Sequence, residues 1–335
     1  MSKANGIAIV GATGLVGKTF LDLLESEHFL DSKIHLVASK KSSGKKITFR
    51  NSVHAVTALQ DFDFSQVQLA FFSAGSEIAK QYAPLAVQKG CFVVDNSSCF
   101  RRDENIPLII PEVNSQSLLN YEIPGIVANP NCSTIQMLVA LKPLHDLFTI
   151  KRIDVTTFQA VSGTGKLAQE ELELQISQSK EREKISSNIY DKQIAFNVLP
   201  HCDDFQENAY TFEEMKIVWE TRKILDSNIE IAATCVRVPV LNGHSESIHI
   251  ETKEDINIDI AKEGLRKAKG VKFLDGEGTG SYITALEADG KNSVYVCRVR
   301  MDISNKNRLN LWVVADNLRK GAALNSIQIA EILFN

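Results

Sequence analysis

The glycine-rich stretch GATGLVG, residues 11–17, constrains the fold of this chain more than any other feature of its sequence. It follows the apolar, β-branched run Gly6–Val10 and opens Leu15–Glu25, whose apolar residues recur with helical spacing. Glycines between a strand and a helix let the backbone approach a pyrophosphate at the helix N-terminus. The spacing GxxGxxG differs from the usual GxGxxG, and the alternative is a tight turn without a ligand. We interpret the stretch as a dinucleotide-binding loop.

The rest of the first third repeats the strand–helix alternation. Strand patterns occur at Ile34–Ala38, Leu69–Phe72 and Cys91–Val94, and Glu77–Lys89 is helical between the last two. Strands that alternate with helices form parallel sheets covered on both faces, with ligands bound at the carboxyl ends of the strands. The sequence therefore predicts an α/β, Rossmann-type domain over residues 1–131.

The second part of the chain has a different pattern. Short polar turns at residues 241–243 and 304–308 favour antiparallel pairing of the strands they join, and Lys166–Lys184 is a long polar helix pattern. We expect an α+β domain with a mainly antiparallel sheet over residues 132–315, and a last helix, within 316–335, that completes the first domain. The predicted strands are Arg152–Gln159, Ile229–Val238, Ser245–Thr252, Val294–Met301 and Leu309–Val314.

Composition excludes several classes of protein. The 335 residues are 44% hydrophobic and 23% charged, with a net charge of −4, which is typical of a globular protein and does not favour a nucleic-acid partner. No apolar run approaches the roughly 20 residues of a membrane span. The start MSKANG lacks a secretion signal and the six cysteines form no CxxC pair, which predicts reduced thiols in the cytoplasm. His201 has no second ligand cluster, so no metal is expected.

Cys132 is the candidate nucleophile. It lies in NPNCST, residues 129–134, just before the helical pattern Ile135–Phe148. The N–H groups and the dipole of a helix N-terminus favour a thiolate and stabilise an oxyanion beside it, and Asn131 adds a side-chain donor. A cysteine at a helix start is more often structural, so this stretch alone does not decide between the two interpretations.

Three polar residues provide partners for a nucleophile. Gln159 ends a predicted strand before the glycine loop SGTG, and Arg237 is a charge within an apolar strand, which requires a carboxylate or an anionic substrate. A turn after Arg237 would bring His244 close to it, and His244 is the best candidate base. An exposed turn histidine is the alternative interpretation of His244.

Three further basic or acidic features carry weaker signals. Thr211 and Glu214 form a capping box that starts a helix, on which Glu213 and Lys216 share one face and could be an ordinary surface pair. Arg101 follows a predicted strand at the ligand edge of the sheet, where it can bind phosphate.

The segment after the second strand indicates which dinucleotide is bound. A carboxylate that holds the ribose 2′-hydroxyl of NAD is expected there, but the sequence is Ser-Lys-Lys-Ser, residues 39–42. Hydroxyl and ammonium groups accommodate a 2′-phosphate, which favours NADP. A solvated basic loop is the alternative.

Together these residues resemble aspartate-semialdehyde dehydrogenase over essentially the whole chain, and the match is closest to the shorter bacterial branch typical of Gram-positive organisms. The matching segments are GATGLVG, DNSSCFR, IIPEVN, NPNCST, QAVSGTG, FNVLPH, EEMK, RVPVLNGHSES and VVADNLRKGAA.

The resemblance implies reversible, NADP-dependent reductive dephosphorylation of aspartyl phosphate to aspartate semialdehyde through a cysteine thioester, in lysine (through diaminopimelate), methionine, threonine and isoleucine biosynthesis. It implies catalytic roles for Cys132 as nucleophile, His244 as acid/base and Gln159 as the group that orients the acyl intermediate. The implied substrate-binding residues are Arg101, Asn131, Glu213, Lys216 and Arg237. The implied NADP contacts are Gly11, Thr13, Gly14, Val16, Ser39, Lys41, Ser42, Ser73, Gly75, Ser162, Gly163 and Asn317.

The resemblance also implies a homodimer, or in some members a tetramer, formed by the second domain. Lys41 stands where many relatives have arginine, and Thr164 where alanine is commoner. Three other functions remain open: N-acetyl-glutamyl-phosphate reductase, which would not need Glu213 for a free amino group, a non-catalytic NADP-binding sensor, and a cysteine hydrolase. The combination of Cys132 with Gln159 and His244 weighs against a sensor, and the glycine loop weighs against a hydrolase.

Overall fold

The computed structural model describes residues 4–26, 28–119, 121–276, 278 and 280–334. The chain folds as two compact units: unit 1 comprises residues 1–131 and 322–335, and unit 2 comprises residues 132–321. The chain re-enters unit 1 after residue 321, and not at residue 316, because Asp316 and Asn317 form side-chain hydrogen bonds within unit 2. None of the helices in the described ranges is long and apolar enough to cross a membrane.

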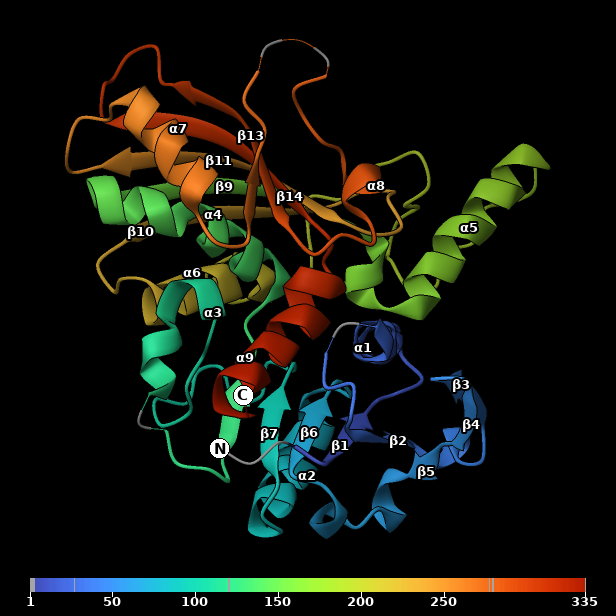
Figure 1. Cartoon of the computed structure of the whole chain (residues 1–335). Helices are drawn as coiled ribbons and strands as arrows, with labels where there is room; N and C mark the ends of the chain where they lie inside the picture. The colour runs from blue at the N-terminus through green and yellow to red at the C-terminus, as the bar shows by residue number, and fades with distance from the viewer. Residues whose placement is uncertain (1–3, 27, 120, 277, 279, 335) are drawn as a thin grey trace. The chain divides into compact units, whose positions relative to one another are not determined.

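A six-stranded parallel sheet forms the centre of unit 1 and confirms the predicted Rossmann-type fold. Its strands are β1 (Gly6–Val10), β2 (Lys33–Ala38), β5 (Thr57–Ala58), β6 (Leu69–Phe72), β7 (Phe92–Asp95) and β8 (Ile126–Ala128). They follow the order β5-β2-β1-β6-β7-β8 (Figure 1). Because the strands are parallel, the segments that follow β1, β2, β6 and β7 leave the sheet at one edge.

Helices cover both faces of this sheet. Apolar side chains of α1 (Leu15–Ser26) and α9 (Leu324–Phe334) form one core with β1, β6 and β7. Alanines of α2 (Ser76–Gln88) form a second core on the opposite face. The remaining elements of unit 1 are a hairpin, a short helix and four 3-10 turns: β3 (Lys46–Phe49), β4 (Ser52–Ala55), α3 (Pro111–Asn114), η1 (Lys40–Ser42), η2 (Leu59–Asp61), η3 (Phe64–Gln66) and η4 (Ser115–Leu118).

Unit 2 contains the mainly antiparallel sheet that the sequence predicts. Its strands are β9 (Ile150–Gln159), β10 (Glu230–Arg237), β11 (His244–Thr252), β12 (Val271–Phe273), β13 (Val294–Met301) and β14 (Arg308–Ala315). They follow the order β10-β9-β11-β14-β13-β12. The pairs β10–β9 and β12–β13 are parallel, and the other neighbours are antiparallel.

One face of this sheet, the inner face, is covered by α4 (Cys132–Phe148), α6 (Phe212–Ile224) and α7 (Ile258–Lys267), as Figure 1 shows. On the outer face α8 (Ala285–Ala288) packs against β14, while Phe158 and Trp312, whose rings are tilted by 36° to each other, stay partly exposed. Unit 2 also contains the helix α5 (Lys166–Lys180) and the 3-10 turn η5 (Val161–Thr164). The π-helix η6 (Arg319–Ala323) begins in unit 2 and ends in unit 1.

Three boundaries in unit 2 differ from the prediction. Helix α4 starts at Cys132 and not at Ile135, because its polar first turn lacks the apolar periodicity by which helices are recognised. Helix α5 ends at Lys180, before Arg182 takes a left-handed φ of 57° that no α-helix continues. The predicted last helix, within 316–335, is a π-turn followed by α9.

The predicted pairing of the strands around residues 241–243 is wrong. The chain leaves β10, crosses β9 and returns as β11 on its other side, so β10 and β11 are not neighbours. The turn at residues 304–308 does join an antiparallel pair, β13 and β14. The connection through residues 241–243 thus passes over the strand β9, whereas the turn at residues 304–308 joins two strands that are direct neighbours in the sheet.

Candidate active site

Three predicted site residues end their strands at one edge of the unit 2 sheet. Gln159 and Arg237 are partners in the parallel register of β9 and β10, and His244 is the first residue of β11 on the other side of β9. All three are buried on the inner face. His244 therefore lies near Arg237 because both strands flank β9, and not because a hairpin turn joins them.

The main chain of Ala160 bonds both flanking side chains. Nη1 of Arg237 donates to the Ala160 carbonyl oxygen at 2.7 Å, and the Ala160 N–H donates to Nδ1 of His244 at 3.1 Å. A Cβ added at Gly163 would lie 2.9 Å from Nη1 of Arg237 and 3.4 Å from Nε2 of His244. The absence of a side chain at Gly163 therefore lets the loop pack closely against both the guanidinium of Arg237 and the imidazole of His244.

His244 is held neutral. Burial first, and then the positive charge of Arg237, lower the pKa of His244 to about 3. Because Nδ1 accepts from Ala160, the proton of the neutral ring is on Nε2. Nε2 is buried and has no hydrogen-bond partner among the residues that the structure describes. A buried donor without an acceptor is costly, so a substrate oxygen is the natural partner of this group.

Arg237 is a buried cation, and its hydrogen-bond acceptor in the described part of the chain is the carbonyl oxygen of Ala160. The side chain is 6% exposed, and within the described part of the chain its Nε has no hydrogen-bond partner. Burial lowers the pKa of Arg237. Neighbouring acidic groups, of which Cys202 and Tyr190 have larger effects than Glu213, outweigh burial and raise this pKa. A buried guanidinium that forms no ion pair with a carboxylate is suited to an anionic ligand.

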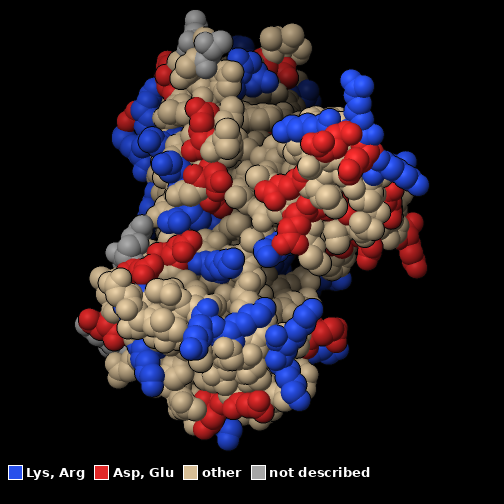
Figure 2. All heavy atoms as spheres, turned by 90° about the vertical axis from the view of Figure 1, so that its right-hand side faces the viewer, with Lys and Arg blue, Asp and Glu red and all other residues tan. Residues whose placement is uncertain are grey.

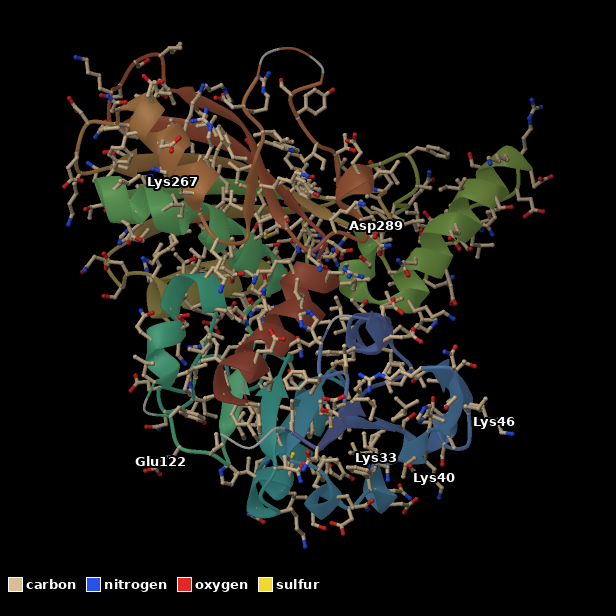
Figure 3. All side chains as sticks on the ribbon, in the orientation of Figure 1. Lys33, Lys40, Lys46, Glu122, Lys267 and Asp289 are labelled. Atoms are coloured by element: carbon tan, nitrogen blue, oxygen red, sulfur yellow. The ribbon has the colours of Figure 1, made fainter. Side chains whose placement is uncertain are left out.

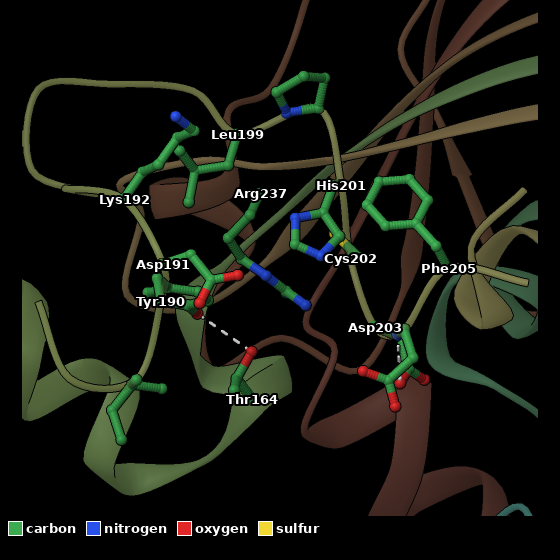
Figure 4. A pocket seen from close by; sticks show the side chains of 13 residues that line it. Thr164, Tyr190, Asp191, Lys192, Leu199, His201, Cys202, Asp203, Phe205 and Arg237 are labelled. Carbon is green, nitrogen blue, oxygen red and sulfur yellow. Dashed lines mark hydrogen bonds between the residues drawn. The ribbon is translucent and has the colours of Figure 1, made fainter. Parts of the chain in front are cut away.

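The guanidinium borders a cavity of about 620 Å³ within unit 2. Figure 4 shows Arg237 between Tyr190 on one wall and His201 and Cys202 on the other. The Tyr190 hydroxyl is hydrogen-bonded at 3.0 Å to Thr164, the residue that stands where alanine is commoner. Thr164 thus fixes Tyr190 on the cavity wall.

An acidic and basic cluster connects Gln159 to helix α6. Nε2 of Gln159 donates to Glu213 at 2.9 Å, and Nζ of Lys216 lies 2.7 Å from the other Glu213 oxygen and 2.8 Å from Asp203. Burial lowers the pKa of Lys216, but the two carboxylates outweigh this effect and raise it. The capping box of Thr211 and Glu214 is confirmed, and it fixes the first turn that carries Glu213.

Cys132 is the first residue of α4, and it is the only one of the six cysteines, all of which the structure describes, that starts a helix. The pKa values of the other five cysteines are raised, first of all by burial, which makes their thiols poor nucleophiles. These are Cys91, Cys99, Cys202, Cys235 and Cys297. Cys132 is half-buried at a helix N-terminus. The chain therefore offers one thiol in the position that favours a thiolate.

Gly321, in the π-helix η6, packs against the nucleophile candidate. A Cβ added at this position would lie 2.9 Å from Cβ of Cys132 and 3.3 Å from its Cα, closer than real side-chain contacts allow. We expect Gly321→Ala to displace Cys132 and to lower kcat by roughly tenfold to a hundredfold, because small misplacements of reacting groups are costly. Steady-state kinetics measure this effect, with Gly280→Ala as a control, since a Cβ there meets nothing within 4 Å and the backbone is not left-handed. Equal kcat values for the two variants would contradict the expectation.

Two predicted cofactor residues of unit 2 bind each other. Nδ2 of Asn317 lies 3.0 Å from Oγ of Ser162, and Oδ1 of Asn317 accepts from the N–H of Gly243 at 2.8 Å. These bonds attach the loop that contains Gly163 to the residue before His244. The side chains of Ser162 and Asn317 therefore shape the site, whatever contacts they make with a ligand.

The predicted glycine loop of unit 1 forms a close-packed cradle. Gly11 has a φ of 95°, and an added Cβ would lie 2.6 Å from the carbonyl oxygen of Ser73. A Cβ at Gly17 would lie 2.2 Å from the Gly11 carbonyl oxygen. The backbone at this point admits only glycine, and it opens helix α1 as a bound pyrophosphate requires. Gly14 is exposed, and Thr13 and Val16 are half-buried in the same turn.

The segments after β2 and β6 lie at the same edge of this sheet. Ser39 and Lys41 are exposed around the turn η1, Ser42 is buried, and Gly75 takes a φ of 90° at the start of α2. Lys40, labelled in Figure 3, belongs to the same turn. Figure 2 shows several basic side chains gathered on the face of unit 1 that carries β2 to β5. This charge suits an additional phosphate.

Arg101 and Asn131 belong to unit 1, whereas the residues that surround Arg237 belong to unit 2. Arg101 follows β7 and donates to the carbonyl oxygen of Asn96 at 2.8 Å, and Asn131 follows β8. Both side chains are largely buried at the edge where ligands bind to parallel sheets.

Several residues of the site carry no signal that sequence reasoning detected. Tyr190 and Cys202 flank Arg237, Asp203 binds Lys216, and Gly321 supports Cys132. Only Gly321, a glycine inside a helical pattern, has a recognisable feature, since such glycines often mark close packing.

Comparison with known proteins identifies the family. Residues 6–121 match the semialdehyde dehydrogenase NAD binding domain, and residues 141–320 match the semialdehyde dehydrogenase dimerisation domain. The chain is 52% identical over 335 residues to an aspartate-semialdehyde dehydrogenase of Legionella pneumophila, covering 99% of this chain and 96% of that protein.

Comparison with solved structures leads to the same family. The structure of aspartate semialdehyde dehydrogenase II from Vibrio cholerae, complexed with ASA, has a TM-score of 0.96 at 46% identity and covers 99% of this chain and 98% of that one. A structure of the Candida albicans enzyme with NADP has a TM-score of 0.73 at 25% identity, with coverage of 99% and 98%. The chain therefore has a nicotinamide-cofactor domain, and it belongs to the aspartate-semialdehyde dehydrogenase family of enzymes.

Proposed function

We propose that this chain catalyses the reversible, NADP-dependent reductive dephosphorylation of aspartyl phosphate to aspartate semialdehyde, with Cys132 as the nucleophile. The observation that carries the proposal is the buried Arg237, which forms no ion pair with a carboxylate in the described chain and lies beside the unpartnered Nε2–H of His244. A cation and a neutral donor in one buried site fit a substrate with a carboxylate and a reacting carbonyl.

The chemistry begins at sulfur. The Cys132 thiolate bonds to the acyl carbon of aspartyl phosphate, the bond from that carbon to the phosphate oxygen breaks, and phosphate leaves with the electron pair. When bound, the nicotinamide cofactor supplies the hydride that reduces the resulting thioester. The carbon–sulfur bond then breaks, which releases the semialdehyde and restores the thiolate.

His244 acts on the oxygen of the reacting carbonyl as its acid/base. Its Nε2–H donates to this oxygen as negative charge develops in each tetrahedral state, and the buried surroundings strengthen the bond. Gln159 orients the acyl group, and its bond to Glu213 fixes its side chain.

The charged residues match the three charged groups of the substrate. Arg237 binds the α-carboxylate and Glu213 the amino group, for which Lys216 must exchange one of its two carboxylate partners. The phosphate is bound by Arg101, Asn131 and Lys216.

NADP is the preferred cofactor, because the turn after β2 offers hydroxyls and ammonium groups and no carboxylate to repel a 2′-phosphate. The Candida albicans relative carries NADP in its structure, which supports this preference. The contacts come from Gly11, Thr13, Gly14, Val16, Ser39, Lys41, Ser42, Ser73, Gly75, Ser162, Gly163 and Asn317.

The proposed assembly is a homodimer through unit 2, with a tetramer as a further possibility. The partly exposed Phe158 and Trp312 on the outer face of its sheet are suited to burial against a second copy. The enzyme would act in the cytoplasm, in the biosynthesis of lysine, methionine, threonine and isoleucine.

The proposal is tested by oxidation of aspartate semialdehyde, followed by the appearance of the reduced cofactor. We expect the rate to require inorganic phosphate and to be higher with NADP than with NAD, since a bound 2′-phosphate adds charge-assisted hydrogen bonds. N-acetyl-glutamate semialdehyde serves as the control substrate and should react at least about a hundredfold more slowly, because it has no ammonium group for Glu213 to bind. Oxidation that is independent of phosphate would contradict the proposed reaction.

A further inference from the structure

A carboxyl group lies buried behind the candidate catalytic residues without an evident role. Glu246 is two residues after His244 on β11, points to the same inner face and is 0% exposed. Its neighbours in the sheet register are Thr157 on β9 and Val313 on β14, neither of which carries a charge. A carboxylate in such surroundings is unstable, and burial raises the pKa of Glu246 well above its usual range.

The polar side chain that faces this carboxyl is Gln136 of α4. Gln136 is also fully buried, and its Nε2 donates to the main-chain carbonyl oxygen of His244 at 3.2 Å. It is four residues after Cys132, so both side chains lie on one side of the helix. Gln136 therefore connects the helix that begins with Cys132 to the strand that begins with His244.

The unpaired atoms between the two side chains are complementary if Glu246 is protonated. Both Glu246 oxygens and Oε1 of Gln136 have no hydrogen-bond donor among the described residues. Buried acceptors without a donor are unfavourable, and protonation of Glu246 supplies an O–H that can donate to the amide oxygen and satisfy both groups. A continuous series of hydrogen bonds then runs from Glu246 through Gln136 to the carbonyl oxygen of His244, and it fixes the amide plane of Gln136.

We infer that Gln136 and a protonated Glu246 form a buried pair that positions Cys132 relative to His244. Neither side chain is a catalytic residue, because both act through the helix and the strand that they connect. The inference rests on the roles proposed above for Cys132 and His244.

Three substitutions test the pair through steady-state oxidation of aspartate semialdehyde. Gln136→Leu and Glu246→Leu remove the polar link at similar volume, and each should lower kcat roughly tenfold to a hundredfold while KM changes less than about twofold. Glu246→Gln replaces the acid by a neutral donor and should retain kcat within about threefold. The double Leu variant should lose no more than the more affected single variant, since the residues act as one unit.

Ile248→Val is the matched control for packing, because Ile248 is the next buried residue on the same face of β11. It should lower the melting temperature and leave kcat unchanged. Wild-type kcat in Gln136→Leu, or a Glu246→Gln variant as impaired as Glu246→Leu, would overturn the inference. If Gln136→Leu does not fold, the two Glu246 variants decide alone. A Cys132→Ala enzyme measured in parallel separates this outcome from a failure of the proposed mechanism.

Discussion

Replacing Cys132 by alanine is expected to abolish turnover, by roughly 10⁴-fold or more, while the cofactor still binds. The expectation follows from the proposed thioester, because alanine offers no atom that can bond to the acyl carbon. The substitution removes one half-buried atom at the first turn of α4 and leaves the helix and its buried face unchanged. Turnover is measured by phosphate-dependent oxidation of aspartate semialdehyde, and binding by the fluorescence of the reduced cofactor.

Cys297→Ala is the matched control, because it removes a thiol from β13, in the core of the same unit. This change leaves a small cavity and should cost about 1 kcal/mol of stability with kcat unaffected. A Cys132→Ala enzyme that keeps more than about one percent of the wild-type rate would exclude a thioester at this residue.

The fold of unit 1 could be predicted from the sequence because each of its signals is local. The glycines of GATGLVG, the apolar strands and the helical periodicities lie close together, and right-handed connections between parallel strands admit few alternatives. The strands β5 and β8 were missed because they are only two and three residues long, too short to show a strand pattern.

The arrangement of unit 2 depends on contacts between distant segments and was only partly predictable. The sequence between β10 and β11 has the composition of a hairpin turn, but β9 occupies the position between them. Burial of the inner face against α4 and α6 decides this order, and no local pattern records it.

The same limit applies to the candidate site. Gln159, Arg237 and His244 were recognisable as polar residues at strand ends, and the family resemblance suggested their roles. Gln136 and Glu246 were not recognisable, because a polar residue inside an apolar pattern suggests a function only when its partner is known. The role of Asp203 was likewise not recognisable, because its partner Lys216 is 13 residues away in the chain.

Replacing His244 by asparagine should lower kcat by about 10² to 10⁴-fold, the usual range for the loss of an acid/base group, with a smaller effect on KM. Asparagine is chosen because its Oδ1 can still accept the N–H of Ala160, so the main chain beside Arg237 keeps its hydrogen bond. The oxygen of the reacting carbonyl then loses the Nε2–H donor.

His249→Asn provides the matched control, because His249 lies on the same strand but between Asp154 and Asp302, on the face that α4 does not cover. The control should keep kcat within about twofold, since surface substitutions away from a site have small effects. An equal loss in both variants would indicate a general effect of changing β11 and not an acid/base role.

The His244→Asn variant also reports the protonation state of the buried His244 ring, through the pH dependence of stability. The unfolded chain binds a proton at the ordinary histidine pKa of 6.5, and the folded chain only at about 3. Between these values the unfolded state holds more protons, so the free energy of unfolding falls as the pH falls, by up to about 1.4 kcal/mol per pH unit. The His244→Asn variant lacks this pH-dependent contribution to stability. Urea unfolding at pH 7 and pH 5 should therefore show a loss of stability about 1–2 kcal/mol larger for the wild type than for His244→Asn. Equal losses would mean that His244 takes up a proton between pH 7 and pH 5 as readily in the folded protein as in the unfolded chain, and its Nδ1 could then no longer accept the hydrogen bond of Ala160 at pH 5.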